Sequence, residues 1–389
     1  MNKKALVLTP LLCLLMLAAC GKKAETTASS STAADSSELI VKIGHASPLT
    51  GSQSHIGKDN ENGTRMAIDE LNASNFQIGG KKAHFELLSE DDQAEGRIAT
   101  TVAQKFVDAK VNGIIGHLNS GTTIPASKIY ADAGLPQISP SATNPKYTQQ
   151  GYKTAFRVMA NDVQQGSVLG TFAVTELKAK KIAIIDDRSS YGQGLADEFE
   201  KAAKAAGATI VGREYTTDKA TDFTAILTTI KGLAPDVLFY GGMDPQAGPM
   251  IKQMQTLGLK VQFLGGDGIQ TPNLIALASN AAEGTIASLP GVPLEEMPGG
   301  KAFKDKFTAK YKEIQLYAPY CYDAVMVMAQ AMQRAGSAEP SKYLAEIPKT
   351  DYQGITAHIK FDGKGDLQGG SITLYQVKNG QWVVLKTVK

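Results

Sequence analysis

The chain has 389 residues, of which 43% are hydrophobic and 20% are charged, and its formal net charge at pH 7 is +2. Because single cores seldom grow beyond roughly 250–300 residues, a chain of this length is expected to form two lobes. The near balance of acidic and basic residues argues against nucleic acid as a partner, since it leaves no basic surface to neutralise phosphates.

The first 20 residues predict export and lipidation. A basic start at Lys3–Lys4 precedes an apolar run at Ala5–Ala19, which has the length of a signal-peptide core and is short for a membrane span. The run ends in Leu-Ala-Ala-Cys-Gly at residues 17–21, a pattern typical of a lipobox. We therefore expect residues 1–19 to be a signal peptide and Cys20 to carry a lipid that anchors the protein to a membrane, in the periplasm or at the cell surface.

Residues 20–37 predict a flexible linker, because they are rich in Ser, Thr and Ala and contain no aromatic residue to bury. Residues 1–19 hold two of the 40 basic residues and none of the 38 acidic ones, so the exported chain would carry 38 of each. This balance leaves the lipid, and not a basic surface, as the anchor. Cys321 would be the one free thiol, and we expect it to be buried in an apolar helix without a disulfide partner.

From residue 38 the chain alternates between short apolar runs and amphipathic helical patterns, the order that builds parallel sheets covered by helices. The first strands are expected at Ile40–His45, His84–Ser89, Gly113–Ile115 and Pro136–Ile138. The first helices are expected at Asn60–Leu71, Arg97–Ala109 and Thr122–Ala133.

The alternation restarts at Lys181–Asp186, whose continuous apolar run is typical of a strand covered on both faces. Further strands are expected at Thr209–Tyr215, Val237–Tyr240 and Val261–Gly265. Further helices are expected at Gly194–Ala206, Asp222–Leu233 and Pro245–Leu257. The pattern predicts two doubly wound α/β lobes in sequence.

The last part of the chain is expected to be helical and then β-rich. Helices are predicted at Lys301–Tyr311 and Ala318–Ala335, and a β-like segment at Ile359–Phe361. An Asn-Gly turn at residues 379–380 separates two further strands, which predicts a hairpin. These strands are expected at Ser371–Val377 and Gln381–Val388.

Two neighbouring strands of the predicted first lobe end in turns rich in hydroxyl groups. Ser120, Thr122 and Thr123 follow one strand, and Ser139–Thr143 follows the next. Ligands of open α/β sheets bind at such strand ends, and the first turn also opens a helix whose N–H groups favour a carboxylate. One such Ser or Thr is more often a helix cap or a loop residue, but two turns one helix apart suit a small anion or zwitterion.

The stretch from Gly116 to Pro145, GHLNSGTTIPASKIYADAGLPQISPSATNP, closely resembles the branched-chain amino acid (Leu/Ile/Val) binding proteins of ABC importers. The resemblance extends over nearly the whole chain after the linker. It implies a type I periplasmic-binding-protein fold, in which a multi-strand hinge joins two lobes. The implied boundaries are residues 38–159 and 290–368 for lobe 1, and residues 160–289 and 369–389 for lobe 2.

The resemblance also implies a function. A monomer of this kind captures an L-amino acid, here expected to be a branched-chain aliphatic one, and delivers it to a membrane ABC permease. The two lobes close over the ligand, which shifts the population by its higher affinity for the closed form. No enzyme activity, cofactor or metal is expected.

For the charged groups of the ligand, the resemblance nominates one residue set. Ser120 and Thr143 would bind the carboxylate, while the Ser141 carbonyl and Thr143 would contact the ammonium. Asp267 would neutralise the ammonium, because a buried charge needs a partner. It stands where the resembling leucine-binding proteins have Glu, so its reach is shorter by one methylene.

For the rest of the site the resemblance nominates residues that close the pocket. Tyr191 would close over the ligand from the second lobe, and Met243 would face it where relatives have an aromatic residue. The remaining pocket residues are Ala142, Leu118, Asn119, Ile56 and Tyr320. Since Asn119 and Ile56 replace different residues of the leucine binders, the identity of the amino acid stays open.

Two alternatives compete with this interpretation, and only the first stays open. The same fold could bind another small polar solute, such as an amide, urea or an aromatic acid, and such a ligand would lack the ammonium that Asp267 pairs. A hydrolase or dehydrogenase is the other class. Its patterns are missing, since the five histidines lack metal-ligand spacing and the Gly-Gln-Gly at 192–194 lacks the third glycine of a dinucleotide turn.

Overall fold

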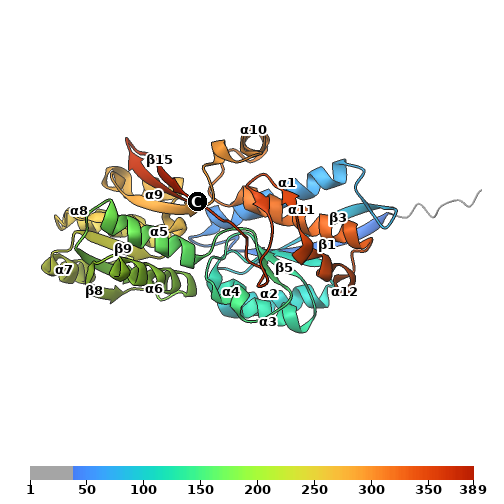
Figure 1. Cartoon of the computed structure of the whole chain (residues 1–389), viewed down its shortest axis with the longest axis horizontal. Helices are drawn as coiled ribbons and strands as arrows, with labels where there is room; N and C mark the ends of the chain where they lie inside the picture. The colour runs from blue at the N-terminus through green and yellow to red at the C-terminus, as the bar shows by residue number, and fades with distance from the viewer. Residues whose placement is uncertain (1–37) are drawn as a thin grey trace, which may run out of the picture. The chain divides into compact units, whose positions relative to one another are not determined.

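The computed structural model describes residues 38–389 (Figure 1). The predicted signal peptide, the predicted lipidation at Cys20 and the linker lie outside the described residues. Within residues 38–389, no helix combines the length and the apolar character that crossing a membrane requires.

The first half of the fold is a six-stranded sheet with the strand order β2-β3-β1-β4-β5-β6. Its strands are β1 (Leu39–Ser47), β2 (Gln77–Ile78), β3 (Lys81–Asp91), β4 (Gly113–Gly116), β5 (Gln137–Ser139) and β6 (Ala155–Arg157). The pairings are parallel except for the short antiparallel β2–β3 pair. Its helices are α1 (Ser54–Ala73), α2 (Gly96–Asp108), α3 (Ser120–Asp132) and α4 (Lys146–Gln149). The predicted strands and helices of this half are confirmed, with shifted ends.

The second half is a seven-stranded sheet with the strand order β15-β14-β11-β10-β9-β7-β8. Its parallel strands are β7 (Lys181–Asp186), β8 (Thr209–Tyr215), β9 (Val237–Gly241), β10 (Gln262–Gly265) and β11 (Ile286–Pro290). The hairpin of β14 (Ile372–Lys378) and β15 (Gln381–Val388) adds to β11 in antiparallel fashion. Ile182 to Ile185 are fully buried, which confirms that β7 is covered on both faces.

The second half also contains the helices α5 (Asp162–Thr175), α6 (Ser190–Ala205), α7 (Thr224–Leu233), α8 (Asp244–Thr256) and α9 (Pro272–Ala278). Short 3-10 helices lie at η1 (Asp267–Ile269) and η2 (Ser279–Ala282). Helix α6 begins at Ser190, four residues before the predicted start, because the Ser189 hydroxyl caps it by accepting the N–H of Gly192. The sequence pattern did not predict α5, α9 or β11.

After β11 the chain returns to the first half. Helix α11 (Ala318–Ala335) packs along α1 and contacts β4 and β5, and Figure 1 shows α1 and α11 side by side. The elements around it are η3 (Leu294–Glu296), α10 (Gly300–Tyr311), α12 (Pro340–Tyr343), η4 (Leu344–Lys349), β12 (Tyr352–Gln353) and β13 (His358–Ile359). The chain then crosses again into β14. These crossings and the two doubly wound sheets give the fold class predicted from the sequence, while the exact lobe boundaries remain a proposal.

Two predicted elements differ in extent because tertiary contacts set their ends. Helix α1 begins at Ser54 and not at Asn60, and the added turn carries Asp59. The two oxygens of the Asp59 carboxylate accept the backbone N–H groups of residues 315–318 at 2.8 to 3.0 Å, so this side chain caps α11 across the fold. The predicted β-like segment at Ile359–Phe361 is shorter: β13 ends at Ile359, and Phe361 forms an isolated bridge with Leu367.

Candidate functional site

A small cavity lies where the turns after several strands meet. Its lining comes from both halves of the fold: Leu118, Asn119, Ser120, Ser141, Tyr191, Met243, Asp267 and Tyr317. Its volume is about 10 Å³, close to the minimum that holds one water molecule. The structure therefore brings together seven of the predicted site residues and adds Tyr317. An amino acid would enter only if the two halves separated or their side chains moved.

The first half supplies the hydroxyl groups. The buried Ser120 begins α3, and its hydroxyl accepts the N–H of Asn144 at 3.2 Å. The Ser141 hydroxyl donates to the Leu118 carbonyl at 3.1 Å and accepts from the Asn60 amide at 3.3 Å. These hydrogen bonds join the turn after β4 to the turn after β5, so both turns face the same cavity.

Thr143 is buried in the second hydroxyl turn but is not part of the cavity lining. Its carbonyl accepts the N–H of Asp162 at 2.9 Å. Within residues 38–389, its hydroxyl oxygen is fully enclosed and has no hydrogen-bond partner. A buried polar atom without a partner costs free energy. The Thr143 side chain also lies beside the Asp162 carboxyl, whose pKa it lowers.

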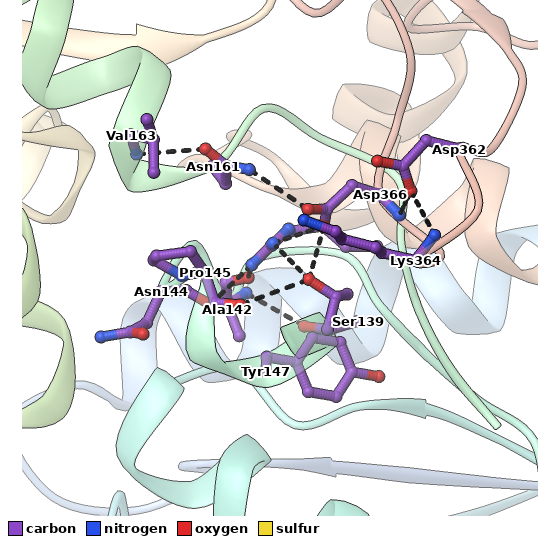
Figure 2. Close-up of polar contacts among 12 residues, drawn as sticks. Ser139, Ala142, Asn144, Pro145, Tyr147, Asn161, Val163, Asp362, Lys364 and Asp366 are labelled. Atoms are coloured by element: carbon purple, nitrogen blue, oxygen red, sulfur yellow. Dashed lines mark hydrogen bonds and ion pairs between the residues drawn. The ribbon is translucent and has the colours of Figure 1, made fainter. Parts of the chain in front are cut away.

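A buried arginine holds the second hydroxyl turn in place. Arg157, at the end of β6, donates to the carbonyls of Ala142 and Asn144, each at 2.9 Å. The same guanidinium pairs with Asp366. Asp366 also accepts from the Asn161 amide at 3.2 Å, and Figure 2 shows these two labelled residues joined. Asp366 lies on the segment that leads to β14, where the chain crosses between the two halves. The Arg157 network therefore connects this segment to the residues on either side of Thr143.

The second half supplies the acid. Asp267 begins η1 directly after β10 and is 1% exposed. One carboxylate oxygen accepts from the Tyr191 hydroxyl at 2.7 Å and from Gln165 Nε2 at 3.0 Å, and the other accepts from the Tyr317 hydroxyl at 2.6 Å. Burial raises the pKa of Asp267, and these hydrogen bonds to its charged form oppose the rise.

The two tyrosines act as neutral donors. Burial raises the pKa of both Tyr191 and Tyr317 well above the ordinary value, with the nearby Asp267 charge adding to the rise. Tyr191 lies in the first turn of α6, as expected for a residue that reaches the cavity from the second half. Its hydroxyl also accepts the N–H of Gly268 at 2.9 Å, which fixes the turn that carries Asp267.

Other predicted residues take up different positions. Ile56 and Ala142 are buried, at 0% and 1% exposure, and are not part of the cavity lining. Tyr320 is also buried outside the lining, and its hydroxyl donates to the Pro290 carbonyl. Met243 lines the cavity directly before α8, and Cys321 is a buried free thiol, as expected.

The sequence patterns missed Tyr317 and Gln165. Tyr317 is the N-cap residue of α11, where its backbone N–H donates to Asp59, so its position depends on a contact between distant segments. Gln165 lies on α5, which was not predicted. The aromatic pair Tyr317 and Tyr320 at the start of a predicted helix was the available signal for the first. Among residues 38–389, no group of three or more His, Cys, Asp or Glu could hold a metal ion.

Direct contacts outside the cavity lining also join the two halves. His55 Nε2 on α1 lies 2.8 Å from Asp244 Oδ2 on α8. The Asn144 amide donates to the carbonyl of Ser190, at the start of α6, at 2.5 Å. These contacts connect the hydroxyl turns of one half to the first turns of helices in the other half.

The comparisons with known proteins identify the family of this chain. The periplasmic binding protein family matches residues 40–381. The Leu/Ile/Val-binding protein homolog 1 of Brucella abortus (strain 2308) is 36% identical over 344 residues, which are 87% of this chain and 91% of that protein.

Two solved structures are similar to the fold. A leucine-binding protein of Thermotoga maritima has a TM-score of 0.83 and 30% identity, and the match covers 90% of this chain and 98% of that chain. A branched-chain amino acid transporter substrate-binding protein of Streptococcus pneumoniae, in complex with isoleucine, has a TM-score of 0.81 and 28% identity, with 90% and 99% covered. This chain therefore belongs to the periplasmic binding protein family.

Proposed function

We propose that this protein is the substrate-binding component of an ABC importer and that it captures an L-amino acid with a branched aliphatic side chain. The observation that carries the proposal is the cavity in which Ser120 and Ser141 of one half face Asp267 of the other. A zwitterion needs N–H and hydroxyl donors for one charge and an acid for the other. The relatives named above, which bind leucine, isoleucine and valine by name or in complex, support this choice.

The ammonium group would bind at Asp267. Two of the three groups that now donate to this carboxylate are tyrosine hydroxyls, from Tyr191 and Tyr317, and both can swing to other acceptors because a hydroxyl rotates freely. An ammonium group adds a full positive charge in a buried site, where a charge-assisted hydrogen bond is stronger than a neutral one. Asp267 thus exchanges neutral donors for a cationic one when the ligand binds.

The carboxylate would bind at the hydroxyl turns. Helix α3 begins at Ser120, which lines the cavity, and a helix N-terminus favours an anion. The Thr143 hydroxyl, which has no hydrogen-bond partner within the described residues, would be satisfied by a carboxylate oxygen. We assign Ala142, Ile56 and Tyr320 to the layer that supports these contacts.

The side chain of the ligand would lie against Leu118 and Met243. Both are apolar, and methionine adapts to irregular shapes, so the wall suits an aliphatic group. Asn119 adds one amide to this wall. Binding would occur between two separated halves that then close, with contacts such as His55 to Asp244 forming on closure.

We further propose that the protein acts as a monomer in the periplasm or at the cell surface, anchored through a lipid on Cys20. It would deliver the ligand to an ABC permease without changing any covalent bond of the ligand. Mass spectrometry of the protein purified from membranes tests the anchor: a diacylated Cys20 at the amino terminus is expected. An unmodified protein that starts elsewhere would contradict it.

A ligand screen tests the main proposal. The protein without residues 1–20 is heated in the presence of each of the twenty amino acids, and also of urea, an amide and benzoate. The largest rise in Tm is expected for leucine, isoleucine or valine, because binding only the native state stabilises it. Stabilisation by urea, the amide or benzoate alone would favour the alternative ligand class, and no rise with any amino acid would contradict the proposal.

A further inference from the structure

Two buried aspartates lie beside each other behind the candidate site. Asp162 is the first residue of α5 and is 0% exposed, and Asp267 is 1% exposed. A single amide group bridges them, because Gln165 Nε2 donates to Asp267 Oδ1 at 3.0 Å and to Asp162 Oδ1 at 3.3 Å. The other side of the same amide accepts the backbone N–H of Asp267 at 3.1 Å and the Ser288 hydroxyl at 2.6 Å. Gln165 therefore holds both carboxylates at a fixed separation.

Neither of these two carboxylates forms an ion pair with another side chain of residues 38–389. The nearby Arg157 donates to Asp366, to the Thr148 hydroxyl and to two backbone carbonyls, and its Nε has no hydrogen-bond partner within the described residues. The second oxygen of Asp162 is enclosed and has no hydrogen-bond partner within the described residues. Two unpaired negative charges in one buried site disfavour each other and are poorly solvated, so one of the acids is stabilised by holding a proton.

The surrounding groups set how strongly the proton is held. Burial, and then the Asp267 charge, raise the pKa of Asp162 to about 8, while the neighbouring Thr143 side chain, the Arg157 charge and the Gln165 amide oppose the rise. The other titratable groups that face the pair are Tyr191 from α6 and Tyr317 before α11. Both tyrosines stay protonated because burial raises their pKa. The proton on the acid pair is therefore the one that an incoming charge can displace.

We propose that Asp162 and Asp267 share a proton before the ligand binds, and that an ammonium group arriving beside Asp267 displaces this proton to solvent. This inference rests on the proposed function. The carboxyl O–H bond breaks, the proton passes to water or buffer, and the second negative charge stays on the protein, where the ammonium balances it. Asp162 is then a positioning residue whose charge state follows the occupancy of the site.

Proton release gives the affinity a defined pH dependence. When binding releases protons, affinity rises with pH, by up to tenfold per pH unit for one proton. The rise is expected between about pH 6 and pH 8, where the pair is protonated without ligand and ionised with it. Below this range the pair keeps its proton both with and without ligand, so the affinity depends less on pH.

Calorimetry with L-leucine tests the inference. The binding enthalpy is measured at pH 7 in phosphate and in Tris, whose ionisation enthalpies differ, and its dependence on the buffer gives the number of protons released. About 0.5 to 1 proton per leucine is expected for the unaltered protein. Asp162→Asn is expected to retain binding while the release falls toward zero. As the matched control, Asp187→Asn replaces a buried acid whose Oδ1 accepts the Ser189 N–H and which forms no hydrogen bond with Gln165, so it should leave the release unchanged.

The outcomes separate the inference from the proposed function. Leucine binding with no buffer dependence, or an Asp162→Asn variant that still releases the proton, would overturn the inference and leave the proposed function standing. Absence of binding by any amino acid would overturn both. If Asp162→Asn does not fold, the affinity of the unaltered protein for L-leucine is measured between pH 6 and pH 8. A rise with pH supports the inference, and an affinity that does not change with pH overturns it.

Discussion

The imidazole of His55 lies 2.8 Å from a carboxylate oxygen of Asp244, and this contact joins the first turn of α1 to the first turn of α8. The same oxygen accepts from Thr271 at 2.7 Å and from Asn273 at 2.9 Å, so Asp244 is fixed within the second half. His55 is 21% exposed and comes from the first half. The contact therefore joins the two halves, and the proposed opening of the site would break it.

We expect His55→Ala to weaken the affinity for L-leucine about three- to tenfold. A partly exposed hydrogen bond contributes about 1 kcal/mol, and we expect only the closed form to contain it. Isothermal titration calorimetry measures the change, with Lys58→Ala as a control because Lys58 is exposed on the same helix. Equal affinities for the two variants would show that the contact does not support closure.

Asn119 is expected to affect the ratio of the affinities for threonine and valine, two ligands of equal shape. Its amide nitrogen donates to Gln53 at 2.8 Å, while its carbonyl oxygen is enclosed and has no partner within residues 38–389. Threonine and valine are isosteric, so their affinity ratio isolates the hydroxyl group, which this oxygen can accept. Asn119→Leu should shift the ratio about tenfold toward valine. An unchanged ratio in competition titrations would remove Asn119 from the side-chain pocket.

Alanine substitution is expected to change stability in opposite directions at two helical glycines. Gly170 is packed closely between α5 and α6, whereas Gly232 is not packed against another element of residues 38–389. A Cβ atom at Gly170 would lie 2.7 Å from the Phe199 carbonyl oxygen and from Ala202 Cβ, so Gly170→Ala should destabilise the fold by about 1–3 kcal/mol. A Cβ atom at Gly232, on α7, would meet nothing within 4 Å. Gly232→Ala should therefore stabilise the fold by about 0.5–1 kcal/mol. Urea unfolding measures both, and a neutral Gly170→Ala would contradict the packing argument.

The buried Asp187 carboxyl is expected to make the stability of the protein depend on pH. Burial raises the pKa of this carboxyl from 3.8 to about 6, although Ser189 donates to it. A folded-state pKa above the unfolded value favours the protonated form, so the protein loses stability as the pH rises from about 4 through 6. Asp187→Asn keeps an acceptor without the charge, and its stability relative to the unaltered protein should grow over this range. A difference that stays constant with pH in urea unfolding would refute this.

Much of the fold was predictable because local patterns decide it. The apolar run at Lys181–Asp186 and the Asn-Gly turn at 379–380 each specify one element, and both were predicted. Helix α5 was not, because Gly166 and Gly170 give it low helix propensity, and its stability comes from the close approach of α6 that these glycines allow. The sequence of residues 162–175 alone therefore contains no periodicity that would predict the packing of α5 against α6.

The candidate site divides in the same way. Three site residues lie shortly after predicted strands, namely Ser120, Ser141 and Asp267. The resemblance to a family predicted them as site residues, and the structure places all three in the lining of one cavity. Tyr317 and Gln165 contact Asp267 only because segments 50 and 102 residues away fold back onto it.

The central claim is that one half binds the carboxylate of the ligand and Asp267 of the other half binds its ammonium. The most direct test is calorimetry of Asp267→Asn with L-leucine and with 4-methylpentanoate, which is leucine without its ammonium. Asp305→Asn, an exposed acid on α10, is the matched control. We predict that Asp267→Asn weakens leucine binding by a factor of 100 or more and leaves 4-methylpentanoate binding within about threefold. Equal losses for both ligands, or no loss for leucine, would contradict the account.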